Sequence, residues 1–352
     1  MNYKIINQLP KRSCKVMDTS KIIERLSDVK SKTVVVLGDF CLDKYIYSKP
    51  CQDDVSVETG KPAWQIYEKK MAAGVAGTIT NNLCALGVKV ICVGFAGNDG
   101  EGFEMKKKLC ELGVNIDYMI TTDELVTATY LKTMRLVDGE YREDIRFDFR
   151  NQNPPSQRLA EKLLENFREA VKLADGVVIS DQFYERNTGT VSDFVKEGVC
   201  EIAKNSKIPF LVDSRAFAHE FKNTYVKCNN YELMKYCLLS GDPESKEDVI
   251  EGAKKLSKMT GCPVFITRNK DGAIVYDGEI HEISAYPVHG EIDVTGAGDA
   301  SNAGIIVGLS LGLSPAESSR LACAVSNITI HVLGDTGVAS IPEVIEKLSE
   351  NI

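Results

Sequence analysis

The chain has 352 residues, of which 43% are hydrophobic and 26% charged, and 42 basic against 50 acidic side chains give a formal net charge of −8. This length allows two ordinary domains or one large α/β domain with an appendage. Because an acidic surface repels phosphate backbones and anionic lipid, neither nucleic acid nor a membrane is expected as a partner.

The sequence also lacks targeting and disulfide signals. It has no apolar run of about 18 residues, and residues 1–17 contain several basic residues but no apolar core of a secretory signal. It has 11 cysteines and no C-x-x-C, and several cysteines fall in apolar stretches such as Leu83-Cys84-Ala85. This pattern favours small buried side chains in a reducing compartment. We therefore predict a cytoplasmic protein.

Short β-rich runs alternate along the chain with longer helical patterns. The predicted strands are nearly continuous runs of Val, Ile, Leu and Phe, which are typical of strands covered on both faces: Thr33–Leu37, Val88–Gly94, Gly176–Ser180, Pro209–Asp213 and Pro263–Thr267. The predicted helices are Thr78–Leu86, Phe103–Leu112, Gln157–Leu173, Gly189–Asn205 and Lys246–Lys258. This alternation predicts a parallel sheet with right-handed crossovers.

Two segments interrupt this rhythm with two-residue alternation. In the second of them, Asp138-Gly139 separates two alternating runs, which predicts a hairpin. We interpret both segments as a small antiparallel sheet that projects from the body as a lid. The predicted division is an N-terminal extension (residues 1–30), an α/β body (31–43, 68–126 and 150–352) and the lid (44–67 and 127–149).

A glycine-rich turn, Asp293-Val294-Thr295-Gly296-Ala297-Gly298-Asp299-Ala300, precedes an apolar helical stretch of small residues. A turn that leads directly into a helix leaves backbone N–H groups unpaired at the positive end of the helix dipole, where an anion can bind. Gly296 and Gly298 lack the Cβ atoms that would keep a phosphate away from the backbone. Asp299, at the helix start, could accept a proton from an attacking hydroxyl.

Two other interpretations of this turn remain open. Asp299 could cap the helix while the glycines only form the turn. A dinucleotide-binding turn fits less well, because the pattern is G-x-G-x-x-S and no acidic residue ends a second strand about 20 residues later. No G-x-x-x-x-G-K-[ST] is present, which argues against a P-loop.

The stretch D-V-T-G-A-G-D-A resembles the C-terminal signature of the ribokinase family of carbohydrate kinases, also called the PfkB family. The resemblance runs from about Thr33 to Ser340. Four further segments resemble family elements in the same order: the first strand at Thr33–Asp43, the N-terminal signature at Gly94–Gly102, the N-x-x-E element at Asn229–Glu232 and the nucleotide-binding stretch at Thr267–Gly272. The resemblance implies a ribokinase-like three-layer α/β body with a mostly parallel central sheet and a small antiparallel β lid.

The resemblance also implies an activity, the transfer of the γ-phosphoryl group of ATP to a hydroxyl of a sugar or sugar phosphate. Asp299 would be the general base, and the amides of Ala297 and Gly298 would form the anion hole, with Gly296 in the same catalytic turn. Asn229 and Glu232 would organise ATP and hold Mg²⁺ through water, although both could instead be ordinary N-cap and first-turn residues of the next helix. The nucleotide site would be lined by Thr267, Arg268, Gly272 and Thr295. The Asp293 region, together with Gly334–Gly337, is similar to the loop that binds a monovalent cation in many members, which implies a K⁺ site at Asp293.

On the sugar side, Asp39 and Asp43 would accept hydrogen bonds from hydroxyls, although Asp39 could instead cap the next turn. Within the family, the bacterial heptose-phosphate kinases are the most similar group, on four segments: Gly38–Tyr45, Ile145–Phe149, Ser180-Asp181 and Asp213–Arg215. Those enzymes phosphorylate the anomeric hydroxyl of a seven-carbon sugar phosphate. The resemblance implies that Asp181 lies in the substrate site, and that the existing phosphate is held by Arg215, Lys132 and Arg146.

The sequence departs from that group at two places. The substrate loop, usually Gly-Gly-Ala-Ala-Asn, is Gly74-Val75-Ala76-Gly77-Thr78 here, so Val75 adds bulk and Thr78 replaces an amide. The stretch that is usually Tyr-x-Lys-Gly is Gln182-Phe183-Tyr184-Glu185 here. It loses a lysine and gains a carboxylate, which disfavours an anionic substrate there. Many members also carry a fused nucleotidyltransferase, and since the chain ends at Ile352 that activity is expected to be absent.

Two functions other than a kinase, and an assembly of two subunits, are also compatible with the sequence. A non-catalytic sensor of a sugar or nucleotide is the main alternative, motivated by the altered substrate loop, and a dinucleotide oxidoreductase is a weaker one. The lid strands would have exposed edges and apolar faces that a second subunit could cover. We predict a homodimer through the lids, with its apolar surface from Tyr45, Ile46, Tyr47, Leu131 and Met134.

Overall fold

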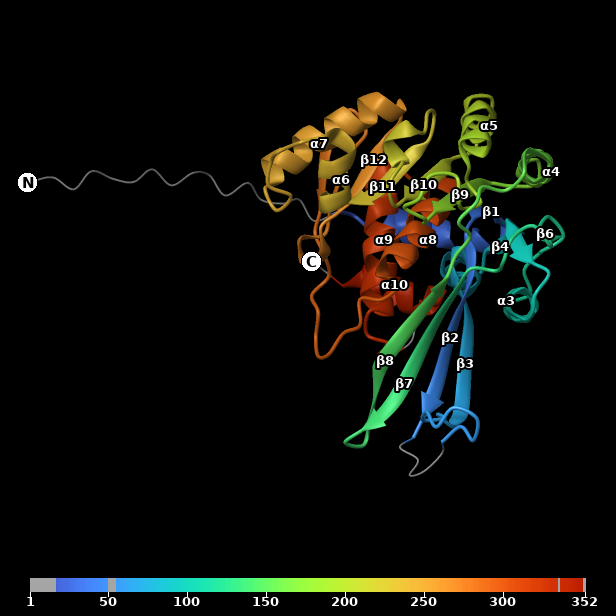
Figure 1. Cartoon of the computed structure of the whole chain (residues 1–352). Helices are drawn as coiled ribbons and strands as arrows, with labels where there is room; N and C mark the ends of the chain where they lie inside the picture. Colours follow the sequence, from blue (N-terminus) through green and yellow to red (C-terminus); the bar gives the residue numbers. More distant parts are fainter. Residues whose placement is uncertain (1–16, 50–54, 335, 351–352) are drawn as a thin grey trace, which may run out of the picture.

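A computed structural model describes residues 17–49, 55–334 and 336–350 of the chain (Figure 1). Several predicted features lie outside the described residues: the first 16 residues of the N-terminal extension, residues 50–54 of the lid, residue 335 of the cation loop, and Cys14 and Cys51. Each of the nine described cysteines is free, and four of them are buried. No helix in the described part of the chain is long and apolar enough to cross a membrane.

The central sheet runs through the middle of the body (Figure 1). Among the described residues it has eight strands in the order β14-β13-β12-β11-β10-β9-β1-β4. Their bounds are β1 (Thr33–Gly38), β4 (Lys89–Val93), β9 (Gly176–Asp181), β10 (Phe210–Ser214), β11 (Tyr225–Asn229), β12 (Val264–Thr267), β13 (Ala273–Tyr276) and β14 (Ile280–Ile283). All pairings from β4 to β12 are parallel, and β13 and β14 add an antiparallel edge. The predicted mostly parallel sheet is confirmed.

Helices cover both faces of this sheet. Alternation along β1 shows why, because Val34 and Val36 belong to one apolar core while Val35 and Leu37 belong to the other. The first core includes residues of α1 (Ser20–Leu26), α2 (Ala76–Ala85), α3 (Gly100–Glu111), α8 (Ala297–Ser310), α9 (Pro315–Thr329) and α10 (Ile341–Ser349). The second includes residues of α4 (Gln157–Val171), α5 (Asp193–Lys204), α6 (Asn230–Cys237) and α7 (Lys246–Thr260). The body therefore has the expected three layers.

Shorter elements connect these layers. Two short strands, β5 (Phe95–Gly97) and β6 (Ile120–Thr122), pair in parallel beside the main sheet. Three turns of 3₁₀-helix complete the described secondary structure: η1 (Val29–Ser31), η2 (Ala218–Glu220) and η3 (Asn269–Asp271).

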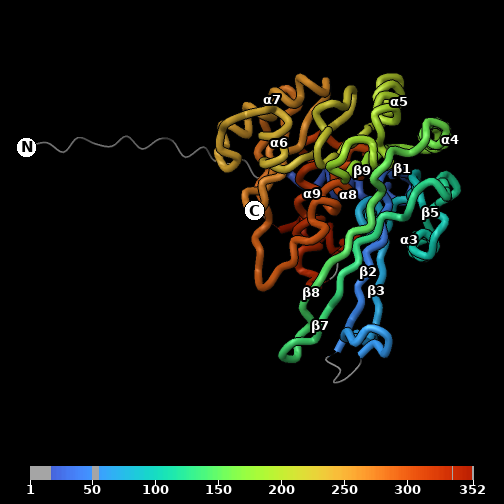
Figure 2. Tube along the Cα trace, viewed as in Figure 1, coloured from blue at the N-terminus to red at the C-terminus, as the bar shows by residue number. Residues whose placement is uncertain are grey.

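A second sheet projects from the body as a long ribbon (Figures 1 and 2). Its order is β3-β2-β7-β8, with β2 (Phe40–Ser48), β3 (Ile66–Val75), β7 (Thr129–Val137) and β8 (Glu140–Phe149). The pairs β2–β3 and β7–β8 are antiparallel, and β2 joins β7 in parallel because both strands leave the body in the same direction. The predicted hairpin is confirmed, since Asp138 (φ 52°) and Gly139 (φ 87°) form its two-residue turn.

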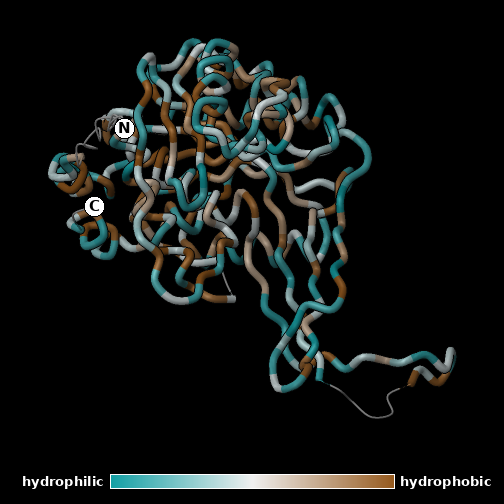
Figure 3. Tube along the Cα trace, turned by 90° about the vertical axis from the view of Figure 1, so that its left-hand side faces the viewer, coloured by the Kyte–Doolittle hydropathy of each residue, from teal (hydrophilic) through white to brown (hydrophobic). Residues whose placement is uncertain are grey.

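The two faces of this lid sheet differ. Cross-strand neighbours share a face, and the rows Asp43–Tyr130–Asp148 and Lys44–Leu131–Phe147 alternate along the ribbon. The inner face, which carries Asp43, is turned toward α8, because its carboxylate acts on the pKa of Asp299. The outer face carries Ile46, Leu131, Ile145 and Phe147. Figure 3 shows the mixed hydropathy of these strands beside the apolar strands of the body.

The sequence analysis missed one strand that matters for the site. β11 has a lysine, Lys227, at its centre, so its apolar run is interrupted and does not resemble a strand covered on both faces. In the structure this side chain is buried all the same and pairs with Asp213.

Candidate active site

The N-terminus of α8 forms the centre of the site. Gly296 is the N-cap residue with φ 80°, a conformation that glycine adopts without strain. The Ala297 amide donates to the Val294 carbonyl at 3.1 Å. Within the described residues, no backbone acceptor engages the amides of Gly298 and Asp299. The free donors are therefore the amides of Gly298 and Asp299, rather than those of Ala297 and Gly298 as expected, because the turn itself uses the Ala297 amide.

The Asp299 side chain is not used as a helix cap. The N-cap residue of α8 is glycine, and no side-chain cap bond is present. In the part of the chain that the structure describes, no hydrogen bond or ion pair engages the half-buried Asp299 carboxylate. Burial and the nearby Asp213 raise its pKa to about 7, against the opposing effects of Lys227 and Arg215. Such a carboxylate can accept a proton near neutral pH.

A buried polar cluster lies beneath this turn. The Lys227 ammonium donates to Asp213 Oδ2 at 2.9 Å, and Asn302 Nδ2, one turn after Asp299 on α8, donates to the same oxygen at 2.5 Å. The side chains of Lys227 and Asp213 are only 7% and 9% exposed. Although burial alone would raise the pKa of Asp213, Lys227 and Asn302 hold it below its ordinary value. The sequence analysis did not identify Lys227 or Asn302.

Asp43 and the start of α2 face the α8 turn from the other side. A Cβ on Gly74 would overlap the Asp43 carboxylate, so glycine is required where β3 passes this side chain. Thr78, in the first turn of α2, is buried, and its Cγ2 lies 3.5 Å from the position of a Cβ on Gly296. Three of the predicted substrate residues thus lie beside the α8 turn.

Val75 connects Gly74 to α2 in an unusual conformation. Its φ of 59° and ψ of −109° lie outside the regions that a β-branched residue normally adopts. Its side chain packs against the small cluster of Cys41, Ala128 and Phe183. A strained residue at this position indicates a constraint on the loop between the lid and α2.

Asp39 and Asp181, which we expected to contact the sugar, instead bind groups of the protein. Both are buried, at 2% and 5% exposure. Asp39 accepts hydrogen bonds from the Gln182 and Thr190 amides at 2.9 and 2.7 Å, so its carboxylate anchors the loop between β9 and α5. Asp181 accepts from the Ser214 hydroxyl at 2.6 Å. The structure thus places both carboxylates under the site, where protein groups already occupy them.

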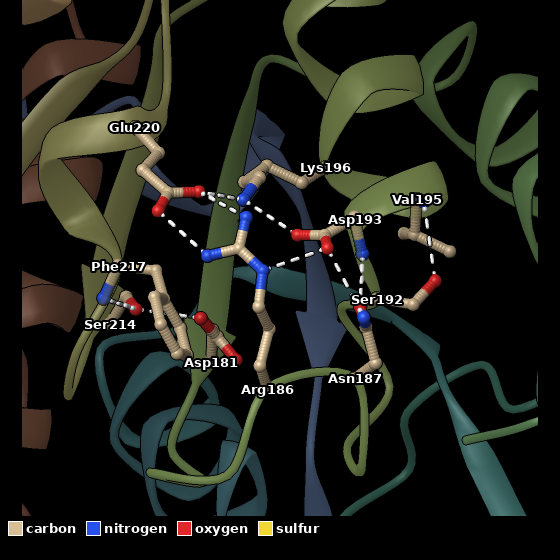
Figure 4. A network of polar contacts seen from close by, with 10 residues as sticks. All are labelled: Asp181, Arg186, Asn187, Ser192, Asp193, Val195, Lys196, Ser214, Phe217 and Glu220. Carbon is tan, nitrogen blue, oxygen red and sulfur yellow. Dashed lines mark hydrogen bonds and ion pairs between the residues drawn. The ribbon is translucent and has the colours of Figure 1, made fainter.

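Charged side chains hold the same loop from its outer side (Figure 4). Arg186 donates to Asp193 at 2.8 Å and to both oxygens of Glu220 at 2.9 and 3.0 Å. Lys196, whose side chain is 11% exposed, also pairs with Asp193 and Glu220. This network fixes the loop that carries Gln182.

Arg215 lies between the loop that carries Gln182 and the first turn of α6. Its Nε donates to Gln182 Oε1 at 2.9 Å, and its Nη1 is 3.8 Å from Glu232 Oε1. The guanidinium also opposes the rise in the pKa of Asp299. This position, between Glu232 and Asp299, suits a group on ATP better than the existing phosphate of a sugar.

Lys132 and Arg146 lie on the inner face of the lid sheet. Arg146 donates to both oxygens of Asp148 at 2.6 and 3.2 Å, and Lys132 is 3.7 Å from Glu143. Arg150, which the sequence analysis missed, also donates to Asp148 at 3.1 Å. Its guanidinium lies 5.7 Å from the ring centre of Tyr130, and its Nε is buried without a partner in the described structure. Only the two-residue spacing after Arg146 and Asp148 could have indicated it.

Asn229 and Glu232 form the capping box of α6. The Asn229 side chain accepts from the Glu232 amide at 2.8 Å, and Glu232 Oε2 accepts from the Asn229 amide at 3.0 Å. Among the described residues, no group of three or more His, Cys, Asp or Glu side chains could hold a metal. Glu232 Oε1 remains outside the capping box, and one such oxygen fits Mg²⁺ held mainly by the phosphates of a nucleotide and by water.

The remaining predicted residues lie at the ends of neighbouring elements. Thr267 ends β12, Arg268 donates to the Glu244 carbonyl at 3.2 Å, and Gly272 closes η3 with φ 79°. Asp293 accepts from the Thr295 amide at 2.9 Å and from the Gly334 amide at 3.3 Å. The structure therefore brings Asp293 and Gly334 together, two parts of the predicted cation loop.

The sequence matches a family model and curated relatives over most of its length. The model of the "pfkB family carbohydrate kinase" matches residues 31–342. The chain is similar to "Bifunctional protein HldE" from Sulfurimonas denitrificans, with 28% identity over 316 residues that cover 89% of this chain and 63% of the relative. The same protein from Caulobacter vibrioides is 29% identical over 312 residues, covering 86% and 61%. The chain thus spans less than two thirds of the length of these relatives.

Solved structures are similar in fold. Arabidopsis thaliana ribokinase complexed with ribose and ATP is 20% identical, with a TM-score of 0.68 and coverage of 91% of this chain and 99% of that one. Escherichia coli phosphofructokinase-2 in complex with potassium is 15% identical, with a TM-score of 0.69 and coverage of 91% and 99%. These similarities confirm the expected ribokinase-like fold.

Proposed function

Because the chain belongs to the pfkB family of carbohydrate kinases, we propose that it transfers the γ-phosphoryl group of ATP to a hydroxyl of a sugar phosphate, with Asp299 as the general base. The observation that carries this proposal is the start of α8. There, two free amides and an unengaged carboxylate with a pKa raised to about 7 lie together. Donors for a phosphoryl group and an acceptor for a hydroxyl proton are what phosphoryl transfer requires.

The proposed reaction is a direct transfer of the γ-phosphoryl group from ATP to the substrate hydroxyl. The substrate oxygen forms a bond to the γ-phosphorus while the bond from that phosphorus to the β–γ bridging oxygen breaks, and the electron pair stays with ADP. The hydroxyl proton passes to the Asp299 carboxylate. The amides of Gly298 and Asp299 donate to oxygens of the transferring group and stabilise its charge.

We propose that ATP binds beside Glu232 and Arg215. Glu232 and Arg215 face each other there, and Thr267, Arg268, Gly272 and Thr295 are proposed to line the site of ATP. Mg²⁺, when bound with ATP, would neutralise charge on the phosphates, with Glu232 and Asn229 as its protein-side oxygens through water. A K⁺ site at the Asp293 loop is proposed as well, since Asp293 and Gly334 meet there.

The sugar side supports a substrate that already carries a phosphate. Lys132, Arg146 and Arg150 lie on or directly after the inner-face rows that contain Asp43, and Arg146 and Arg150 share one carboxylate, that of Asp148. Arg150 is also 3.9 Å from Glu185, and Lys132 is 3.7 Å from Glu143, so a sugar phosphate would compete with carboxylates for these cations. Arg150 Nε, which is buried without a partner in the described structure, is the donor left for it. The resemblance to heptose-phosphate kinases makes a heptose 7-phosphate our first candidate, with Asp43 as acceptor from the sugar hydroxyls.

ADP release with Mg-ATP tests the proposal against a panel of ribose, a nucleoside, fructose 6-phosphate and heptose 7-phosphate. Each phosphorylated sugar is matched by its unphosphorylated form. We expect turnover with a sugar phosphate and loss of that turnover in Asp299→Asn. Ligand-stabilised melting without turnover for any sugar would contradict the kinase proposal and favour a sensor.

A further inference from the structure

Lys227 is a buried cation whose position calls for a physical reason. It lies at the centre of β11, where its neighbours Val226 and Cys228 are apolar and fully buried. Burial of a charged pair carries a large desolvation cost for each ion, and well-packed apolar residues of similar volume often stabilise a protein equally well. A role in stability alone is therefore a weak explanation for Lys227 and Asp213.

The position of the ammonium relative to α8 gives a better reason. Lys227 Nζ lies 3.1 Å from the position that a Cβ on residue 298 would occupy. Residue 298 is a glycine whose amide is one of the two free donors of the turn. The missing side chain leaves the ammonium beside the place where those amides would hold an anion. Because the Lys227 side chain is buried, its Coulombic interactions are screened little by solvent.

Two groups hold Lys227 in this place. Asp213 Oδ2 accepts from Lys227 Nζ at 2.9 Å and from Asn302 Nδ2 at 2.5 Å. Because Asn302 belongs to the same helix as Gly298, the contact ties the lysine on β11 to the start of α8. Arg215 is a different kind of cation, since its side chain is 48% exposed and reaches toward Glu232.

We propose that Lys227 is the fixed cation of the phosphoryl-transfer site, which acts on the transferring group through the gap at Gly298, with Asp213 and Asn302 as its positioning residues. This inference rests on the proposed kinase function. In the transition state, negative charge spreads over the transferring group and the leaving oxygen, and a preoriented ammonium stabilises that charge without reorganisation.

Lys227→Met tests the proposal, because methionine keeps much of the length and volume but removes the charge. We expect kcat to fall roughly 10²- to 10³-fold, as for the loss of one preoriented donor in an active site, while the KM for ATP changes much less. Lys227→Arg should recover part of the activity.

A pH profile separates this role from a purely structural one. The charged groups that act on Asp299 are Asp213, Lys227, Arg215 and Asp43, and Lys227 lowers its pKa. Removal of the ammonium should therefore move the acid limb of the kcat/KM profile of Lys227→Met to higher pH. A change in packing alone would reduce activity without moving this limb.

Lys196 offers a matched control. It is also a buried lysine paired with carboxylates, those of Asp193 and Glu220, but it lies in the network of Figure 4, away from α8. Lys196→Met should lose stability while it keeps the wild-type acid limb, because this ammonium does not act on the pKa of Asp299.

The outcomes are distinguishable. If the wild type turns over a sugar, and folded Lys227→Met has a normal kcat and an unmoved acid limb, this inference is overturned while the proposed kinase function stands. Absence of turnover in the wild type with every sugar of the panel would overturn the proposed kinase function and this inference with it. A thermal melt of each variant identifies one that has failed to fold, and Lys227→Arg then provides the measurement.

Discussion

The two sides of the site are built from different material. On the phosphoryl side, the groups are backbone amides at the start of α8 and side chains that the central sheet buries, such as Asp213 and Lys227. On the sugar side, most groups are long, half-exposed side chains on a projecting ribbon, such as Lys132 and Arg146. The first side is fixed by the fold itself, whereas the second depends on how side chains pair across strands. Chemistry is therefore easier to infer here than substrate identity.

Asp299→Asn should give the largest effect on the phosphoryl side. Loss of a general base typically costs about 10²- to 10⁴-fold in rate. We expect this loss in kcat, with little change in the KM for ATP or sugar, because the amides of Gly298 and Asp299 remain. Initial rates of ADP release measure it. Near-normal turnover in the variant would show that another group accepts the proton.

The same variant should be more stable than the wild type at neutral to alkaline pH. Burial raises the pKa of Asp299 to about 7, so the folded state holds the proton more tightly than the unfolded state does. The wild type therefore loses stability as the pH rises from about 4 to about 7. Asn lacks this loss, so the melting temperature of the variant should exceed that of the wild type by more at about pH 8 than at about pH 5.

Gly74→Ala should give the largest effect on the sugar side. The new methyl group would overlap the Asp43 carboxylate, which must then move. We expect the KM for the sugar to rise about tenfold or more, since a misplaced contact group weakens substrate positioning, while the KM for ATP stays unchanged.

Gly100→Ala provides the control for this variant. Gly100 begins α3, and a Cβ there would meet no atom within 4 Å. It should therefore leave both KM values at their wild-type levels. An equal rise of the sugar KM in both variants would contradict a specific role for the contact between Gly74 and Asp43.

The pH profile of kcat/KM reports on Asp299 and on the cations of the sugar side in one measurement. If Asp299 is the base, it must be deprotonated, so kcat/KM should fall about tenfold per pH unit below a pKa of about 7. The hydrogen bond to Asp148 raises the pKa of Arg146, so this guanidinium keeps its charge across the range and should not produce the acid limb. A profile that is flat between about pH 6 and about pH 8 would contradict the assignment of Asp299.

The sequence predicted the fold and the glycine-rich turn before α8 well, for a local reason. The strands around Val34–Leu37 and Val177–Ile179 are continuous apolar runs, and the α8 turn is one contiguous motif. β11 was missed because the partner that allows Lys227 to be buried, Asp213, lies 14 residues earlier in the chain. No local pattern records such a pairing.

The sugar side was predicted less well because its geometry is nonlocal. Asp39 follows a strand and resembles a ligand in the sequence, but its oxygens bind amides from residues 182 and 190. Tyr45, Tyr47 and Met134, which we expected at a dimer surface, lie on the inner face, whereas Ile46 and Leu131 lie on the outer one. Alternation along each strand separates these two sets, and the register between β2 and β7 shows which residues of the two strands share a face.

The outer face leads to the prediction with the smallest effect on chemistry. Ile145 and Phe147 there are 53% and 49% exposed, and Leu131 and Ile46 flank them. A second copy of the chain would bury this apolar row and remove the exposed sheet edge.

Phe147→Glu should therefore convert a dimer to a monomer in sedimentation, while kcat changes by less than about twofold, since the inner face is untouched. The matched variant Tyr141→Glu should remain a dimer, because the Tyr141 ring packs edge to face against Tyr47 of the inner face. A wild type that already sediments as a monomer would contradict the predicted assembly, and would leave the outer face as ordinary exposed surface.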